Sequence, residues 1–264
     1  MLEAFAEWHR ALHPVWQAVV GGSGTWLLTA LGASVVLLLR NPPRRMLDGT
    51  LGFAAGVMVA ASCWSLLIPA IDLGGVGRAI VGLLVGAAFL FLLDQRLPHL
   101  HPEHDPSSPL PPEGPRVAWQ RTILLIVAIT LHNIPEGLAV GVSYGAGNWG
   151  AATALAIGIG LQNMPEGLAV SVPLRREGFT RRRALWYGQL SAIVEPIAAA
   201  LGALLVLWVR PVLPYALAFA AGAMLYVVVE ELIPETERAG NVDVATMGFI
   251  IGFATMMGLD AALA

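Results

Sequence analysis

The sequence predicts an all-α integral membrane protein with eight transmembrane helices, a 3+2+3 inverted repeat and both chain ends outside the cytoplasm. Three observations lead to this fold class: an apolar composition, a series of long hydrophobic runs, and segments that recur within the chain. Of the 264 residues, 56% are hydrophobic and 12% are charged, whereas soluble domains carry about a quarter charged residues. The chain must therefore present apolar residues to lipid along most of its length.

Eight apolar runs are long enough to cross a hydrocarbon core of roughly 30 Å. They form one transmembrane domain that covers residues 1–264. The segment 94–120 interrupts them and is rich in Pro and His, which predicts a solvated loop. The runs lie at 15–39, 49–71, 78–93, 122–144, 150–173, 184–209, 214–235 and 244–262.

The distribution of arginines predicts the orientation, because short cytoplasmic loops are enriched in basic residues. With the N-terminus outside, only Arg10, Arg78 and Arg210 fall on the outer side. The loop 94–120 is then cytoplasmic. The N-terminus lacks the basic region of a cleavable signal peptide. Every basic residue is Arg, a usage typical of GC-rich bacterial genomes, and we expect a multi-pass protein of the bacterial inner membrane.

Other classes of protein find little support in the composition. A single cysteine, Cys63, excludes an intramolecular disulfide and any cysteine-based metal cluster. The formal net charge is −3, and no basic patch indicates a nucleic-acid partner. The sequence therefore predicts the lipid bilayer as a partner and no nucleic acid.

One repeated segment links two distant runs. The residues FAAGVM at 53–58 recur as FAAGAM at 219–224, and Leu-Ile-Pro at 67–69 recurs at 232–234, with one residue of slip between the two matches. These runs cross the membrane in opposite directions, and an inverted repeat of this kind is typical of transporters with a site at the repeat interface. Chance similarity between Ala- and Gly-rich helices is the alternative.

A second repeat is tighter. The sequence LHNIPEGLAV at 131–140 returns as LQNMPEGLAV at 161–170, with eight of ten positions identical. A spacing of four residues places His132 and Glu136 on one helix face, and Gln162 and Glu166 on the face of the next helix. Ionisable residues inside a span are costly and indicate function.

The neighbouring residues extend this pattern. Asn133 and Asn163 lie one position further along each helix, and Glu195 in the sixth run is a third intramembrane carboxylate. Three carboxylates in a low dielectric repel one another unless a cation compensates. Oxygen and imidazole ligands suit a divalent metal ion. Taken singly, the Pro-Gly pairs are equally typical of a kink, a lone Glu of a proton carrier, and a lone His of a hydrogen-bonded core residue.

The motifs HNIPEG at 132–137 and QNMPEG at 162–167 resemble the fourth- and fifth-helix signatures of the ZIP (Zrt/Irt-like) metal transporters. The paired form is most similar to the GufA-like branch. The resemblance covers the whole chain, including the eight runs and the His-containing loop after the third. It implies a divalent metal ion transporter that carries metal into the cytoplasm by alternating access, and also a homodimer. Zinc is the expected ion, and Cd²⁺, Fe²⁺ and Mn²⁺ remain alternatives.

The resemblance also implies a binuclear centre near the middle of the membrane. Its first site would use His132, Glu136, Gln162 and Glu166, with Met58 as a soft ligand. Its second site would use Asn133, Asn163 and Glu195, with Glu136 and Glu166 bridging the two. Related proteins often have a carboxylate where this chain has Asn163, so the second site is less charged here.

Further residues fit a transport path. Asp72 and Asp260 lie where an ion would enter, and Glu230 and Glu231 where it would leave. Asp72 is equally typical of an ordinary helix end. His99, His101 and His104 resemble a metal-handling loop of the family, and a merely soluble linker is the alternative for them.

Two other functions use the same ligands. An intramembrane metal-dependent hydrolase would keep an open coordination position to activate water, but the chain lacks an HExxH motif and has no Ser or Cys nucleophile beside a base. A metal sensor that does not transport is the third hypothesis. Of the three hypotheses, only the transporter predicts metal flux across a sealed bilayer. Because the motifs of a hydrolase are absent, we expect the protein not to be an enzyme.

Overall fold

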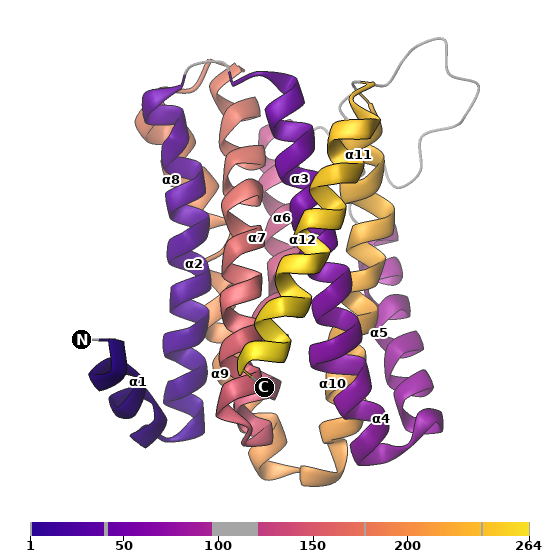
Figure 1. Ribbon diagram of the computed structural model, residues 1–264. Helices are drawn as coiled ribbons and strands as arrows, with labels where there is room; N and C mark the ends of the chain where they lie inside the picture. The colour runs from indigo at the N-terminus through magenta and orange to yellow at the C-terminus, as the bar shows by residue number, and fades with distance from the viewer. Residues whose placement is uncertain (1, 40–41, 97–120, 177, 239, 264) are drawn as a thin grey trace.

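The computed structural model describes residues 2–39, 42–96, 121–176, 178–238 and 240–263, and these residues are nearly all helical. The long helices lie side by side in one bundle, and the two chain ends lie toward the same end of it (Figure 1). The elements are α1 (Leu2–Ala11), α2 (Pro14–Leu38), α3 (Arg44–Ala60), η1 (Ala61–Leu67), α4 (Ile68–Gly74), α5 (Val76–Arg96), α6 (Arg121–Ala146), α7 (Trp149–Arg176), α8 (Arg181–Leu190), α9 (Val194–Trp208), η2 (Arg210–Val212), α10 (Leu213–Val227), η3 (Val228–Leu232), α11 (Ile233–Glu237) and α12 (Val242–Leu263).

The predicted all-α class with several membrane-spanning helices is confirmed. Within the described residues, six helical segments are long and apolar enough to cross a membrane: α2, α3–α4, α5, α8–α9, η2–α11 and α12. The helices that carry the polar motifs, α6 and α7, are long but are not among these six. Every predicted run nevertheless falls on a helical segment.

Three boundaries differ from the prediction. The helix predicted at 78–93 extends to Arg96, so the first residues of the predicted loop 94–120 are helical. The short helix α1 precedes the first predicted run. The run 184–209 is divided by a turn at 191–193 between α8 and α9. Because Pro196 has no N–H to bond back to the carbonyl of Ala192, an uninterrupted helix is disfavoured there.

Two π-helical turns, η1 and η3, were not predicted and occur in the two copies of the first repeat. Each ends immediately before an Ile-Pro pair, at Pro69 and Pro234. A π turn accommodates an additional residue without ending the helix. The one-residue slip between the copies falls in the segment that contains these turns.

The repeated glycines place helices in backbone contact. A Cβ at Gly56 would lie 2.0 Å from the carbonyl oxygen of Phe249 in α12, and a Cβ at Gly222 would lie 2.0 Å from that of Leu83 in α5. Gly86 of α5 makes the same approach to the carbonyl oxygen of Phe219, at 2.0 Å. The two copies therefore use equivalent glycines to pack α3 on α12 and α10 on α5, within one chain.

We expect Gly86→Ala to lower the thermal unfolding temperature of the purified protein. The added methyl would overlap backbone rather than a movable side chain, and overpacking of this kind costs about 1–3 kcal/mol. The matched control is Gly77→Ala in the same helix, where no atom lies within 4 Å of the added Cβ. Equal unfolding temperatures for the two variants would contradict the close α5–α10 contact.

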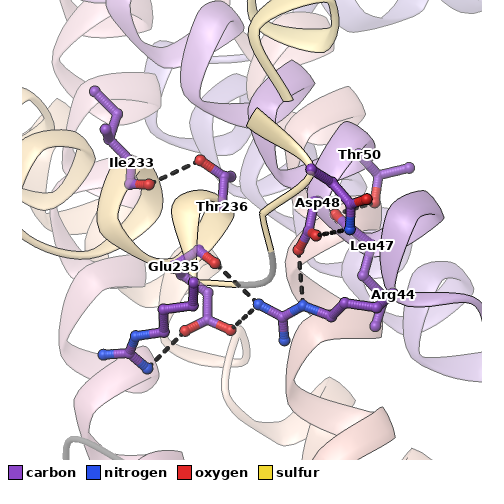
Figure 2. A network of polar contacts seen from close by, with 9 residues as sticks. Arg44, Leu47, Asp48, Thr50, Ile233, Glu235 and Thr236 are labelled. Atoms are coloured by element: carbon purple, nitrogen blue, oxygen red, sulfur yellow. Dashed lines mark hydrogen bonds and ion pairs between the residues drawn. The ribbon is translucent and has the colours of Figure 1, made fainter. Parts of the chain in front are cut away.

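A charged network connects α3 with α11 at the end of the bundle opposite the chain ends (Figures 1 and 2). Arg44 forms an ion pair with Asp48 at 2.8 Å and another with Glu235 at 2.7 Å. Asn241 donates to the second oxygen of Asp48 at 2.8 Å, and Arg238 pairs with Glu235. The Asp48 side chain is fully buried, so these donors compensate for the loss of its hydration.

Candidate metal centre

The motif helices α6 and α7 remain helical through Pro135 and Pro165. The glycine after each proline-glutamate pair then fits against another helix. A Cβ at Gly137 would lie 2.5 Å from the carbonyl oxygen of Glu195 in α9, and a Cβ at Gly167 would lie 2.1 Å from that of Thr29 in α2. The repeated Pro-Glu-Gly sequence therefore brings the motif glutamates to tightly packed helix crossings.

Glu136 and Gln162 meet across the α6–α7 contact. The amide Nε2 of Gln162 donates to Oε1 of Glu136 at 2.6 Å, and both side chains are at most 1% exposed. The predicted convergence of the two motifs is present for this pair. It joins the first copy of the motif, through Glu136, to the second copy, through Gln162.

Three more polar residues continue the group into α9. Asn163 donates from Nδ2 to Oε1 of Glu195 at 2.8 Å, and Asn133 donates from Nδ2 to the carbonyl oxygen of Ser191 at 2.9 Å. Gln162 also approaches Oδ1 of Asn163 at 3.4 Å. Asn133, Asn163 and Glu195 are all buried. The residues assigned by resemblance to the second site thus surround the junction of α6, α7 and α9.

Four buried oxygen atoms of the same group accept no hydrogen bond within normal geometry, although the Thr25 hydroxyl of α2 also acts on the Glu195 carboxyl. They are Oε2 of Glu136, Oε2 of Glu195, Oδ1 of Asn133 and Oε1 of Gln162. Each of these side chains has committed its other polar atom to a hydrogen bond, so the atoms left over are all acceptors. An unsatisfied buried polar group normally has an ion or water as its partner. Four acceptor oxygens without donors form a set that suits a cation.

The negative charges of the group also favour a bound cation. Glu136 experiences repulsion from Glu166 and Glu195, and Glu195 from Glu166. Such repulsion in a low dielectric is relieved by a positive charge. Among the described residues, no three His, Cys, Asp or Glu side chains enclose a common point. The carboxylates of this group are instead accompanied by the amide oxygens of Asn133 and Gln162.

His132 points to a different partner from its motif neighbour. Its Nδ1 lies 3.0 Å from Oε2 of Glu231, a residue of η3. Glu166 and Asp94 also act electrostatically on this imidazole. His132 thus connects the motif helix α6 with a residue that the sequence placed on the release side of the path. In this arrangement the His132 imidazole is paired with Glu231.

Comparison with known proteins identifies the family. A model described as ZIP zinc transporter matches residues 112–260, a region that contains both motifs and Glu195. The chain is 42% identical to the zinc transporter ZIP11 of Homo sapiens, over 94% of this chain and 98% of that protein. It is 41% identical to the zinc transporter ZIPB of Bordetella bronchiseptica, over 93% and 81%. It is 38% identical to the zinc transporter GufA of Myxococcus xanthus, over 89% and 94%.

The chain belongs to the ZIP family. Membership confirms the resemblance drawn from the two motifs, including its similarity to GufA. ZIP proteins are transporters, so the prediction that this chain is no enzyme is confirmed and the hydrolase hypothesis is wrong. A multi-pass membrane protein is likewise confirmed by the family together with the six apolar helical segments.

Other predicted residues of this ZIP chain lie outside the orphaned group. Asp260 of α12 accepts a hydrogen bond from Oγ of Ser65 at 2.9 Å, whereas Asp72 is an exposed residue of α4. Glu230 is exposed and Glu231 is half-buried. Met58 is buried in the core cluster that also contains Met224. His99, His101 and His104 lie outside the described residues.

Sequence reasoning missed Asp94 and its hydrogen-bond partner Tyr226. Tyr226 of α10 donates its hydroxyl proton to Oδ2 of Asp94 at 3.2 Å, and Asp94 acts electrostatically on His132. Asp94 was assigned to the loop because the predicted span ended at 93. The residues at the predicted end, Asp94, Gln95 and Arg96, include no Gly or Pro, and this was the available signal that the helix continues.

Proposed function

We propose that this ZIP protein carries divalent metal ions, with zinc as its main substrate, into the bacterial cytoplasm. The observation that carries the proposal is the set of buried acceptor oxygens without donors around Glu136 and Glu195. The matching relatives are named zinc transporters, and mixed oxygen and nitrogen ligands suit zinc and similar borderline ions. Cadmium, iron and manganese are further candidate substrates.

The ligand assignment has two parts. Glu136, Gln162, Glu166 and His132 form the first site with the Met58 thioether, and Asn133, Asn163 and Glu195 form the second. Glu136 and Glu166 bridge the two. The 2.6 Å bond between Gln162 and Glu136 and the 2.8 Å bond between Asn163 and Glu195 support this division. His132 completes the first site after it leaves Glu231, which then receives the ion on its way to the cytoplasm.

The transport cycle is alternating access through eight spans with outside termini. The six apolar segments, together with α6 and α7, supply these spans, and the inverted 3+2+3 repeat relates the contacts α3–α12 and α10–α5. One bundle of spans 1, 4, 5 and 6 moves against spans 2, 3, 7 and 8 around the ion. Because Arg44 joins α3 to α11, it holds together members of the second bundle.

Several accompanying features complete the proposal. Asp260 and Asp72 receive the ion on the outer side, and Glu230 and Glu231 on the inner side. The loop with His99, His101 and His104 handles metal in the cytoplasm, and the protein works as a homodimer in the inner membrane. Bacterial relatives such as GufA and ZIPB support that location.

The proposal is tested by loading proteoliposomes that contain the purified protein with a fluorescent chelator and adding Zn²⁺, Cd²⁺, Fe²⁺ or Mn²⁺ outside. We expect saturable uptake of Zn²⁺ that exceeds leakage into protein-free vesicles. Binding of these metals without movement of any of them across the sealed bilayer would contradict transport and favour a metal sensor.

A further inference from the structure

The turn between α8 and α9 interrupts the regular helical hydrogen bonds inside a segment long and apolar enough to span a membrane, where each unsatisfied backbone group is costly. The carbonyl oxygens of Gln189 and Leu190 accept from the backbone N–H groups of Ala192 and Ile193, both at 3.3 Å. Side-chain donors add to these backbone bonds. Oγ of Ser191 donates to the carbonyl oxygen of Gly188 at 2.7 Å, and Nε1 of Trp26 donates to that of Gln189 at 3.0 Å. The Asn133 amide donates to the carbonyl oxygen of Ser191 at 2.9 Å. The break is therefore a built feature, held by donors from α2, from α6 and from Ser191 of the turn itself.

Of these three donors, only Trp26 belongs to α2. Its indole N–H also lies 2.9 Å from Oε1 of Gln189, so one donor is shared by the backbone and the side chain of a single buried residue. An indole ring has few rotatable bonds, and its N–H usually finds a partner when it is buried. Trp26 thus fixes the carbonyl end of α8 against α2.

The same face of α2 also contacts the chain on the other side of the break. Gly22 lies one helical turn before Trp26. A Cβ at Gly22 would lie 3.0 Å from Cα of Pro196 and 3.1 Å from the carbonyl oxygen of Glu195. Helix α2 therefore holds both the end of α8 and the beginning of α9.

Glu195 belongs to that first turn and is fully buried. Oε1 of Glu195 accepts from Asn163, and Oε2 is one of the orphaned oxygens. We propose that Trp26 is a positioning residue for Glu195: by bonding Gln189 it holds the α8–α9 break in the geometry that presents this carboxylate to the metal. The proposal rests on the proposed function, in which Glu195 is a ligand of the second site.

The test is a zinc titration against a competing chelator, with detergent-purified wild type, Trp26→Phe, Glu195→Gln and the double variant. Trp26→Phe keeps an aromatic ring and removes the N–H. We expect its apparent zinc dissociation constant to rise about tenfold, the lower end of the loss caused by removing an outer partner of a ligand. The matched control is Trp16→Phe, a change at an exposed position of the same helix that should bind zinc as wild type does.

The double variant separates positioning from general stability. If Trp26 acts through Glu195, Trp26→Phe costs little further affinity once Glu195 is Gln, because the two changes are coupled. Two results would overturn the positioning role alone. In one, the losses of zinc affinity of the two single variants multiply in the double variant. In the other, Trp26→Phe binds zinc as the wild type does while Glu195→Gln binds it more weakly. Wild-type affinity in Glu195→Gln would overturn the proposed second site as well.

A second variant covers the case in which Trp26→Phe does not fold. Ser191→Ala removes the hydroxyl that donates to Gly188 and leaves the Ser191 carbonyl in place for Asn133. We expect a smaller loss of zinc affinity, again absent in the Glu195→Gln background. An unchanged affinity for Ser191→Ala, in the absence of folded Trp26→Phe, would count against the role of the break.

Discussion

Glu136→Gln is expected to raise the zinc dissociation constant roughly 100-fold, because the loss of a charged ligand costs about 3 kcal/mol. The substitution keeps an oxygen that can accept from Gln162, whose amide lies 2.6 Å from Glu136. It removes the negative charge and replaces one carboxylate oxygen by an NH₂ group, which donates hydrogen bonds and cannot bind a metal ion. Zinc titration of the purified protein measures the effect.

The control for Glu136→Gln is Glu237→Gln, which makes the same chemical change at an exposed position of α11. Both variants should elute as the wild type does. Without metal, Glu136→Gln should unfold no earlier than the wild type, since it removes a charge that Glu166 and Glu195 repel when ionised. Comparable zinc affinities for the two variants would exclude Glu136 as a central ligand.

Asn163→Asp is expected to lower the stability of the metal-free protein and to enlarge the stabilisation that zinc provides. In the present structure Asn163 donates to Glu195 at 2.8 Å, in a fully buried setting. A carboxylate at this position cannot donate when ionised, so two negative oxygens would face each other. Breaking a buried, charged hydrogen bond in this way costs on the order of 3 kcal/mol.

Bound zinc reverses that penalty, since a cation compensates both carboxylates and a ligand stabilises the state that it binds. The measurement is the thermal unfolding temperature with and without saturating Zn²⁺. We expect a larger zinc-induced increase for Asn163→Asp than for the wild type. Asn163→Leu is the control, because it also removes the hydrogen bond but adds no ligand, and zinc should stabilise it least. An equal increase in all three proteins would place zinc away from residue 163.

The sequence predicted those parts of the centre that lie within one helix or one repeat. The copies of the motif around Pro-Glu-Gly carried the resemblance to the family, and the four-residue spacing of His132 and Glu136, repeated at 162 and 166, indicated a shared site. The 2.6 Å contact between Glu136 and Gln162 supports that site. The recurrence of FAAGVM as FAAGAM predicted equivalent segments, and the structure gives Gly56 and Gly222 equivalent contacts with the backbones of neighbouring helices.

The sequence patterns could not predict the contacts between helices that lie far apart in the chain. The pairing of His132 with Glu231 depends on how α6 and η3 face each other, and no local pattern determines this rotation. The break after α8 was hidden because the run 184–209 is apolar on both sides of it. The donors that stabilise the break, Trp26 and Asn133, come from other helices. For the same reason no local pattern distinguishes the role of Trp26 from that of Trp16.

The most direct test of transport through this centre is zinc flux into sealed proteoliposomes, measured in parallel for the wild type and for Glu136→Ala/Glu166→Ala. The variant removes both glutamates that are proposed to bridge the two metal sites. We predict saturable flux for the wild type and flux no greater than in protein-free vesicles for the variant, with the variant still folded. Wild-type flux in the double variant would contradict a transport path through the paired motifs.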